Sequence, residues 1–372
     1  MRVLLTADTV GGVWTYALDL SAGLAGRGVE VVLATMGAAM SDEQRAAAEG
    51  IPGLRLAESA YRLEWMQDPW EDVRRAGEWL LRLRDRLQPD LVHLNGYAHG
   101  ALDWGLPVLM VGHSCVLSWW QAVKGEPAPA EWDRYRQAVR SGLAAADLVV
   151  APTGAMLAAL QEHYGPLDST AMIANGANAD AYRVGRKEPL VLAAGRLWDE
   201  AKNVAALEAV APGLRWPVYV AGQQQHPDGG QRRPQALRCL GALPRAELAG
   251  WMARAAVFAA PARYEPFGLT ALEAGLSGCA LVLGDIPSLR EVWGTAALFV
   301  APDDADLLAG ALGRLIEHPA VQAAYGVRAR RRALQFGASR MTDGYMAAYR
   351  RLLRVEGGAD RPEGTLEIER SA

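Results

Sequence analysis

The chain has 372 residues, which is long for one hydrophobic core and suits two domains. Its 51% hydrophobic and 22% charged residues are typical of a soluble globular protein, and its net charge of −4 offers no general attraction to nucleic acid. No apolar run approaches the roughly 20 residues of a membrane helix, and the apolar run at the start is too short for a secretion signal. We therefore expect a cytoplasmic protein with at most peripheral membrane contact, and we interpret its three widely spaced cysteines as ordinary thiols.

The chain opens with the pattern of an α/β nucleotide-binding fold. Residues 3–7 predict a buried strand, Gly11 and Gly12 a tight turn, and the apolar spacing that follows a helix. A third glycine is missing, and the next predicted strand, residues 29–35, ends without the acidic residue of an NAD site. The pattern therefore predicts an α/β nucleotide fold but argues against a dinucleotide site.

Aromatic residues lie just past the glycine turn and again further along. Trp14 and Tyr16 could stack on a sugar or simply pack in the core, and the sequence leaves both readings open. Trp119 and Trp120 begin a region rich in Pro and Trp that extends to Trp132. We interpret that region as an acceptor-side element.

Two apolar runs, residues 91–95 and 107–112, predict buried strands, and the second delivers His113 at its carboxyl end. Open α/β sheets bind ligands at the carboxyl ends of their strands, so His113 is a candidate site residue. A single histidine is more often structural, and we assign no function to the others, His93 among them.

A second α/β unit begins with a predicted strand at residues 190–194. Arg196 follows directly, and Lys202 lies a few residues on. Two cations at a strand's carboxyl end suit a diphosphate, because the guanidinium can fork two oxygens and the ammonium supplies a point charge. The alternative is an ordinary surface ion pair.

The most informative stretch is residues 263–274. It follows a predicted strand at residues 255–261, turns at residues 265–268 and opens a helix at Leu269. Backbone N–H groups at this helix start, expected to be free at Gly268, Leu269 and Thr270, would bind an anion such as a phosphate. Glu265 and Glu273 frame the turn and would repel a phosphate, so we expect both to accept hydrogen bonds from sugar hydroxyls. The site therefore predicts a sugar nucleotide.

This stretch, with seven residues between two glutamates within Glu-Pro-Phe-Gly-Leu and Leu-Glu-Ala, resembles the signature of the retaining glycosyltransferases of family 4. The resemblance implies an α/β protein of GT-B architecture, with two Rossmann-like domains facing each other across a cleft and a C-terminal helix returning to the first. It implies that Glu265 faces the donor sugar and Glu273 the ribose. Arg196 and Lys202 are implied to contact the diphosphate, and His113 the donor sugar or leaving phosphate. The backbone of Phe267, Gly268, Leu269 and Thr270 is implied to contact sugar and phosphate, and the backbone around Leu243 the base. Gly11 and Gly12 are implied to face the reaction centre and the acceptor, the alternative being a tight turn without a ligand.

The same resemblance sets the expected domain limits. We expect residues 1–183 with a returning helix at 338–356, a donor domain at 184–337, and a flexible tail at 357–372. The segment at residues 172–178 resembles the family's hinge, but Ala174 and Asn178 replace its usual Pro and Asp.

The expected activity is transfer of a sugar from a nucleoside diphosphate to an acceptor hydroxyl with retained anomeric configuration, without cofactor or essential metal. UDP is the first expectation, with GDP or ADP as alternatives, and the acceptor is expected to be a carbohydrate or glycolipid. A non-catalytic sugar-nucleotide or glycan-binding protein and a sugar-nucleotide epimerase remain as alternatives, which turnover of a donor with an acceptor would distinguish.

Overall fold

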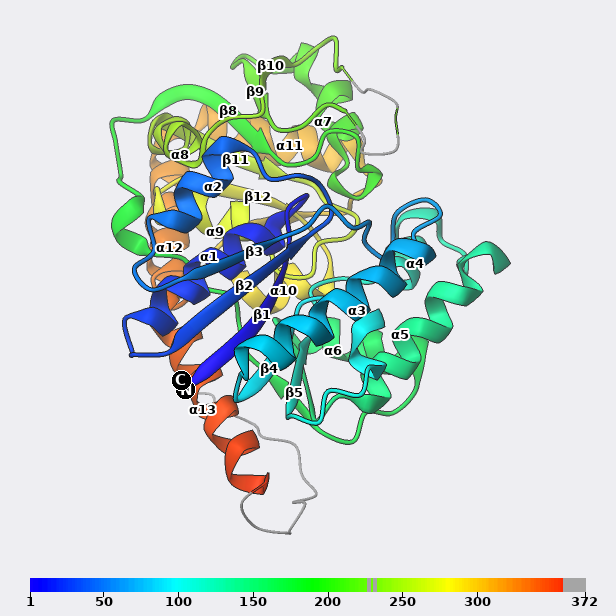
Figure 1. The fold of residues 1–372 in the computed structure, drawn as a ribbon. Coiled ribbons are helices and arrows are strands. Elements are labelled where there is room, and N and C mark those ends of the chain that lie inside the picture. Colours follow the sequence, from blue (N-terminus) through cyan, green and yellow to red (C-terminus); the bar gives the residue numbers. More distant parts are fainter. Residues whose placement is uncertain (226–228, 230–232, 357–372) are drawn as a thin grey trace. The chain divides into compact units, whose positions relative to one another are not determined.

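The computed structural model describes residues 1–225, 229 and 233–356 (Figure 1). The chain divides into two compact units, between Gly176 and Ala177. The first contains residues 1–118, 127–176 and the segment from Ala338 onward, and the second contains Trp119–Glu126 and Ala177–Gly337. The expected tail, residues 357–372, lies outside the described residues.

The first unit is built on a seven-stranded parallel sheet with the strand order β3-β2-β1-β4-β5-β6-β7. Its strands are β1 (Arg2–Asp8), β2 (Glu30–Met36), β3 (Arg55–Glu58), β4 (Leu91–Leu94), β5 (Val108–Val111), β6 (Leu148–Ala151) and β7 (Thr170–Met172). Its helices are α1 (Gly12–Ala25), α2 (Asp42–Glu49), α3 (Trp70–Leu87), η1 (Ala98–Ala101), η2 (Ala130–Trp132), α5 (Asp133–Ala145), α6 (Gly154–Tyr164) and α13 (Ala338–Glu356). Helix α4 (Val116–Lys124) begins in this unit and ends in the other.

The second unit is built on a six-stranded parallel sheet with the order β10-β9-β8-β11-β12-β13. Its strands are β8 (Glu188–Ala194), β9 (Val218–Ala221), β10 (Arg238–Gly241), β11 (Ala255–Ala260), β12 (Ala280–Gly284) and β13 (Leu298–Val300). Its helices are η3 (Ala179–Ala181), η4 (Glu200–Lys202), α7 (Val204–Val210), η5 (Ala211–Gly213), α8 (Arg245–Arg254), α9 (Leu269–Leu276), α10 (Pro287–Trp293), α11 (Ala305–Glu317) and α12 (Pro319–Ala333).

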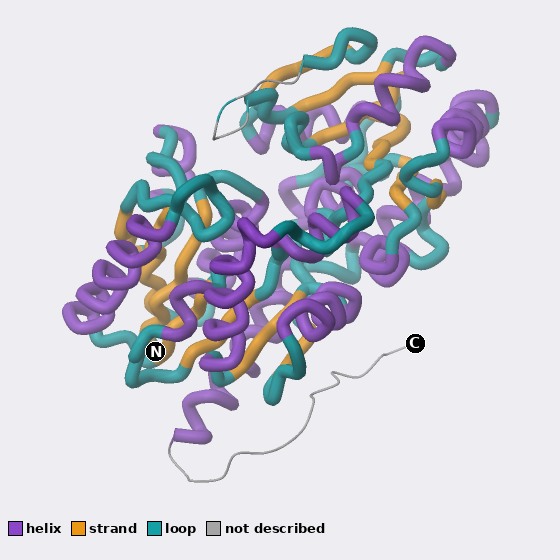
Figure 2. Tube along the Cα trace, turned by 90° about the vertical axis from the view of Figure 1, so that its right-hand side faces the viewer, coloured by secondary structure: helices purple, strands orange, loops and turns teal. Residues whose placement is uncertain are grey.

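The strands form because continuous apolar runs favour a sheet that is covered on both faces. Every residue of β12 is buried, and so are the five central residues of β1. In the second unit, α7 and α11 pack on one face of the sheet, whereas α8, α9 and α12 cover the other. Figure 2 shows the strands of each unit running between helices. The expected α/β class with two Rossmann-like domains is confirmed.

The last helix belongs to the first unit, as expected, since α13 packs against α1. The two helices come very close at Gly23, where an added Cβ would lie 2.1 Å from Oγ1 of Thr342. Arg27, just past α1, donates through Nε to Oδ1 of Asp343 at 3.0 Å. The close backbone approach therefore requires glycine at position 23.

Cys115, Cys239 and Cys279 are free thiols, the first and last buried and the other half-buried. Within the described residues, no helix has the length and apolarity needed to cross a membrane, and no group of three or more His, Cys, Asp or Glu side chains is placed to hold a metal ion.

Candidate active site

In each sheet, successive strands are added on one side of the first strand and then on its other side. The place where this change occurs is called the switch point, and open α/β sheets bind ligands at the carboxyl ends of the strands beside it. In the first sheet this point lies between β1 and β4, and in the second between β8 and β11. The loops that follow β8 and β11 carry Arg196, Lys202, Glu265 and Gly268. The sequence-predicted cations and the glutamate turn therefore meet at the switch point of the second sheet.

The loop after β11 makes a tight turn before α9. Gly268 has the left-handed backbone angle φ = +89°, which favours glycine, and it precedes the first residue of the helix. Its N–H donates to Oε1 of Glu265 at 3.0 Å, and the Ser288 hydroxyl donates to the Glu265 carbonyl at 2.5 Å. The expectation that the Gly268 N–H is free is therefore wrong for this structure, because a nearby carboxylate already uses it. For the next two N–H groups, those of Leu269 and Thr270, the described part of the chain offers no hydrogen-bond acceptor.

Lys202 lies against this turn. Its Nζ donates to Oε2 of Glu265 at 2.6 Å, so the same carboxylate bridges the ammonium and the start of α9. Asn203, buried and itself in a left-handed conformation, donates through Nδ2 to the carbonyls of Pro261 and Pro302, at 2.9 and 2.7 Å. These bonds attach the end of η4 to the loops after β11 and β13 and thereby place Lys202.

Arg196 is held by a different carboxylate. Its Nη2 lies 2.8 Å from Oδ2 of Asp199, while Oδ1 of Asp199 accepts from Nε1 of Trp119 at 3.0 Å and from the backbone of Ala201 at 3.0 Å. Burial alone would raise the pKa of the Asp199 carboxyl, but the charges of Arg196 and Lys202 and these hydrogen bonds lower it below its usual value. Asp199 therefore remains ionised and fixes the Arg196 guanidinium.

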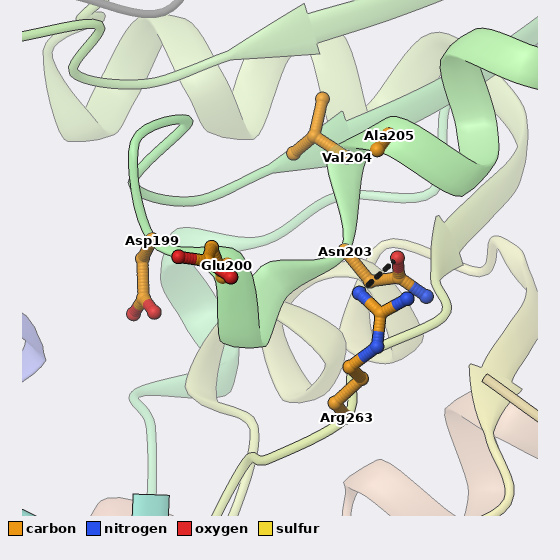
Figure 3. A pocket seen from close by; sticks show the side chains of 6 residues that line it. All are labelled: Asp199, Glu200, Asn203, Val204, Ala205 and Arg263. Carbon is orange, nitrogen blue, oxygen red and sulfur yellow. Dashed lines mark hydrogen bonds between the residues drawn. The ribbon is translucent and has the colours of Figure 1, made fainter. Parts of the chain in front are cut away.

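A pocket beside η4 is lined by neither Arg196 nor Lys202. It is lined by Asp199, Glu200, Asn203, Val204, Ala205 and Arg263. Figure 3 shows Asn203 and Arg263 directed toward each other, with Nη1 of Arg263 donating to Oδ1 of Asn203 at 2.6 Å. Arg263 also pairs with Asp303 through Nη2 at 2.8 Å. The pocket is thus bordered by groups that brace the Lys202 loop, and neither Lys202 nor Glu265 lines it.

Glu273 lies on the same helix as Thr270 but is buried, with 6% of its surface exposed. Its Oε1 accepts from the Tyr182 hydroxyl at 2.6 Å and lies 3.7 Å from Nε of Arg245, which in turn donates to the Tyr182 oxygen at 3.0 Å. The role expected for Glu273 toward ribose stays a prediction, and any ribose hydroxyl would have to share the carboxylate with Tyr182. Leu243 lies between β10 and α8, just before Arg245.

In the first unit the ring of Tyr16 packs against His113. The His113 ring lies 4.5 Å from that of Tyr16 between centroids, edge to face. The His113 side chain is half-buried, and the loss of solvent around its imidazole lowers the pKa to about 3, so the ring is neutral at physiological pH. Tyr16 is 1% exposed and Trp14 is 8% exposed. Their predicted stacking on an acceptor stays a prediction, and in this structure Tyr16 supports His113 from within the core.

The remaining predicted residues are divided between the units. Gly11 precedes the first residue of α1, and Gly12 begins it. Trp119 and Trp120 belong to the second unit and contact each other, with ring centroids 5.8 Å apart. Trp119 hydrogen-bonds Asp199, as described above, and so contributes to the surroundings of Arg196. Phe267 is buried and packs edge-on against Phe336 at 5.6 Å, so only its backbone is left for a ligand.

Sequence reasoning missed several residues of this site. Asp199, Asn203, Tyr182 and Arg245 each hold a predicted residue or its loop in place. Asp199 lies three residues after Arg196, a spacing that allows an ion pair, and could have been suspected. The contact between Tyr182 and Glu273 joins residues 91 positions apart and leaves no local pattern.

The fold and the two switch-point sites define a class of protein. The sucrose-phosphate synthase of Thermosynechococcus elongatus superposes with a TM-score of 0.79 at 21% identity, covering 95% of this chain and 100% of that one. Anabaena HepE in complex with UDP-glucose gives a TM-score of 0.75 at 17% identity, again with 95% and 100% covered. The fold is that of a GT-B glycosyltransferase.

The sequence comparisons narrow the class to a family. Residues 10–181 match the model "Glycosyltransferase Family 4", and residues 188–318 match "Glycosyl transferases group 1". A glycogen synthase of Mycobacterium tuberculosis is 26% identical over 86% of this chain and 87% of its own length. A D-inositol 3-phosphate glycosyltransferase of Frankia alni is 26% identical, over 92% and 95%. The chain belongs to glycosyltransferase family 4.

Proposed function

We propose that the protein transfers a sugar from a nucleoside diphosphate, with UDP as the first candidate, to an acceptor hydroxyl with retention of the anomeric configuration. The observation that carries the proposal is the meeting of Arg196 and Lys202 with the start of α9 at one switch point. These groups can stabilise the negative charge that develops on a departing diphosphate. Solved structures of similar fold contain UDP with glucose or UDP-glucose, which supports UDP as the first donor to test.

In the proposed reaction, Arg196 and Lys202 hold the diphosphate oxygens, together with the N–H groups of Leu269 and Thr270 at the helix start. The carboxylate of Glu265 now occupies part of this space, so we expect it to turn toward the sugar when the donor binds. Arg196 and Lys202 supply the positive charge that stabilises the departing diphosphate, and the leaving phosphate takes the proton of the acceptor hydroxyl.

The proposal specifies the acceptor only by its chemical class. Named relatives include a glycogen synthase, which acts in polysaccharide synthesis, and D-inositol 3-phosphate glycosyltransferases. We therefore propose a hydroxylated carbohydrate or glycolipid acceptor and cytoplasmic action, with membrane contact that is at most peripheral.

A thermal-shift screen tests the donor site first. UDP, GDP and ADP, each alone and as the glucose conjugate, are added to the wild type, to Lys202→Ala and to Lys124→Ala. Lys124 is a matched control, because it is a lysine of the same unit whose carboxylate partner, Glu200, is exposed. At a hundred times its dissociation constant a ligand adds roughly 2.7 kcal/mol of stability. One nucleotide should stabilise the wild type and Lys124→Ala and have much less effect on Lys202→Ala.

If no nucleotide stabilises any of the three proteins, the donor site is wrong and a glycan-binding role gains weight. Where a donor is found, NMR of the product formed on an added acceptor reports its anomeric configuration. An inverted product would contradict retention, and release of a free altered sugar without acceptor would indicate an epimerase.

A further inference from the structure

A chain of side-chain hydrogen bonds runs from β1 to His113 in the first unit. Nδ2 of Asn95, which follows β4, donates to the carbonyl oxygen of Thr6 at 2.6 Å. The backbone N–H of Asn95 donates to Oγ1 of the same threonine at 2.8 Å. A carbonyl can only accept, so the Asn95 amide nitrogen must face Thr6 and its oxygen must face the other way.

The Asn95 oxygen faces His113. Oδ1 of Asn95 lies 2.8 Å from Nε2 of His113, and because that oxygen can only accept, Nε2 must carry the hydrogen. Burial lowers the pKa of His113 to about 3, so the ring holds a single proton. Nδ1 of His113 is therefore an unprotonated acceptor, and no described residue donates a hydrogen bond to it.

The other titratable groups near His113 do not change this assignment. The Tyr16 ring packs on it, and burial raises the pKa of the Tyr16 phenol well above its usual value. His93 is its electrostatic neighbour on β4; burial and the nearby His113 lower the pKa of His93 to about 3, against the opposing effect of a hydrogen bond with Asn95. Both neighbours are neutral at physiological pH, so neither charge favours an imidazolium at position 113.

We propose that Asn95 is a positioning residue that holds His113 in the neutral Nε2–H tautomer, so that Nδ1 accepts a hydrogen bond from a hydroxyl of the donor sugar. The choice of a donor sugar as the ligand rests on the proposed function, whereas the assigned tautomer of His113 does not. Positive charge develops on the sugar ring as a glycosyl bond breaks. A neutral acceptor does not oppose that charge, whereas an imidazolium would repel it and would offer no lone pair.

The topology explains the pairing. Asn95 and His113 follow β4 and β5, which are adjacent parallel strands, so both side chains emerge at the same edge of the sheet. Thr6 contributes from β1, the neighbour of β4 on its other side. Three consecutive strands of the sheet thus orient one imidazole.

The test compares Asn95→Asp with Gln137→Glu, the same replacement of an amide by a carboxylate at an exposed residue of the first unit. Long-range proton–nitrogen NMR of protein labelled in histidine rings reports the tautomer, and the signals of position 113 are identified by their loss in His113→Gln. The wild type should show protonated Nε2 and bare Nδ1 down to about pH 5, since the pKa lies near 3. In Asn95→Asp the added carboxylate favours the imidazolium, and both nitrogens should be protonated near neutral pH.

Activity is read separately with UDP-glucose or with whichever sugar nucleotide stabilises the wild type. Asn95→Asp should lose about tenfold or more in kcat/KM at pH 7, with recovery at higher pH as the ring loses its extra proton. Stabilisation by UDP should be unchanged, because Arg196 and Lys202 lie in the other unit. Gln137→Glu should behave as the wild type in every measurement.

Protonated Nδ1 or an imidazolium in the wild type at pH 7 would overturn the proposal, and so would wild-type kcat/KM in Asn95→Asp. If Asn95→Asp does not fold, Asn95→Ala replaces it and should populate the Nδ1–H form with a similar loss of kcat/KM. Failure of every nucleotide to bind would instead contradict the proposed function, while the wild-type spectrum would still decide the tautomer of His113.

Discussion

At the scale of single residues, the candidate donor site is a set of paired charges. Lys202 pairs with Glu265 and Arg196 with Asp199, and Glu265 also accepts the Gly268 N–H. An internal carboxylate thus lies where a phosphate would be expected to approach. Binding of a diphosphate must therefore exchange one anion for another at Lys202.

The change Glu265→Gln tests this exchange. It keeps the shape of the side chain but removes a charge that repels a diphosphate, so UDP should bind about fivefold more tightly, which corresponds to roughly 1 kcal/mol. Transfer should nevertheless fall by about a hundredfold, because the carboxylate is proposed to face the sugar on which positive charge develops. Calorimetric titration with UDP and the initial rate of transfer measure the two effects.

The matched control is Glu200→Gln, which neutralises an exposed carboxylate of the same unit. It should leave both quantities close to the wild type. Weaker binding of UDP to Glu265→Gln would show that the carboxylate assists the diphosphate and does not compete with it.

At the scale of elements, close backbone approaches decide how the parts of each unit pack. An added Cβ at Gly222, after β9, would lie 1.7 Å from the carbonyl oxygen of Gly195, after β8. Because Arg196 follows Gly195 directly, this contact sets the path of the loop that carries it. The approach of α1 and α13 at Gly23 does the same for the helix pair of the first unit.

We expect Gly23→Ala to destabilise the first unit by about 1–3 kcal/mol, because the new methyl group would overlap the buried Thr342 side chain. Gly310→Ala is the control. Gly310 lies within α11 with no atom near its added Cβ, and alanine there should stabilise the helix by about 0.5–1 kcal/mol. Urea unfolding monitored by circular dichroism compares them, and equal stability of Gly23→Ala and wild type would contradict the predicted close packing.

At the scale of the whole molecule, the last helix, α13, completes the first unit. His93 on β4 lies between the Tyr16 hydroxyl, 3.3 Å from Nε2, and the Tyr349 hydroxyl, 2.6 Å from Nδ1. These bonds join α1, β4 and α13 through one fully buried imidazole. No function was predicted for His93, and its role here is structural.

This buried imidazole makes stability depend on pH. The pKa of His93 is lowered from 6.5 to about 3 by burial and by His113, and burial lowers that of His113 to about 3 as well. Below pH 6.5 the unfolded chain binds these protons and the folded one does not, so the free energy of unfolding decreases as the pH falls toward 3. Between pH 6.5 and 5 each such histidine costs up to about 2 kcal/mol.

Urea unfolding at pH 7 and 5 measures the loss. His93→Gln should reduce the dependence on pH, even though it lowers stability at pH 7, whereas a change at the exposed His318 should leave the dependence as it is. A wild-type protein that is equally stable at both pH values would show that these rings are protonated in the folded state.

The sequence by itself determined the fold class, the family and the stretch around which the donor site is built. Apolar runs of strand length followed by glycine turns are local signals, and the two glutamates with their intervening helix start form one contiguous motif. Arg196 and Lys202 could be predicted for the same reason, because both directly follow one strand and the carboxyl ends of strands are where such folds bind ligands.

Only the tertiary structure decided what each of these groups contacts. Glu265 caps Gly268 and pairs with Lys202, Glu273 is held by Tyr182, and Asn95 orients His113. These partners lie on different strands and helices, from 18 to 91 residues apart in three of the four contacts. Local periodicity reports which face of an element is buried, whereas the pairing of polar side chains depends on how separate elements pack together.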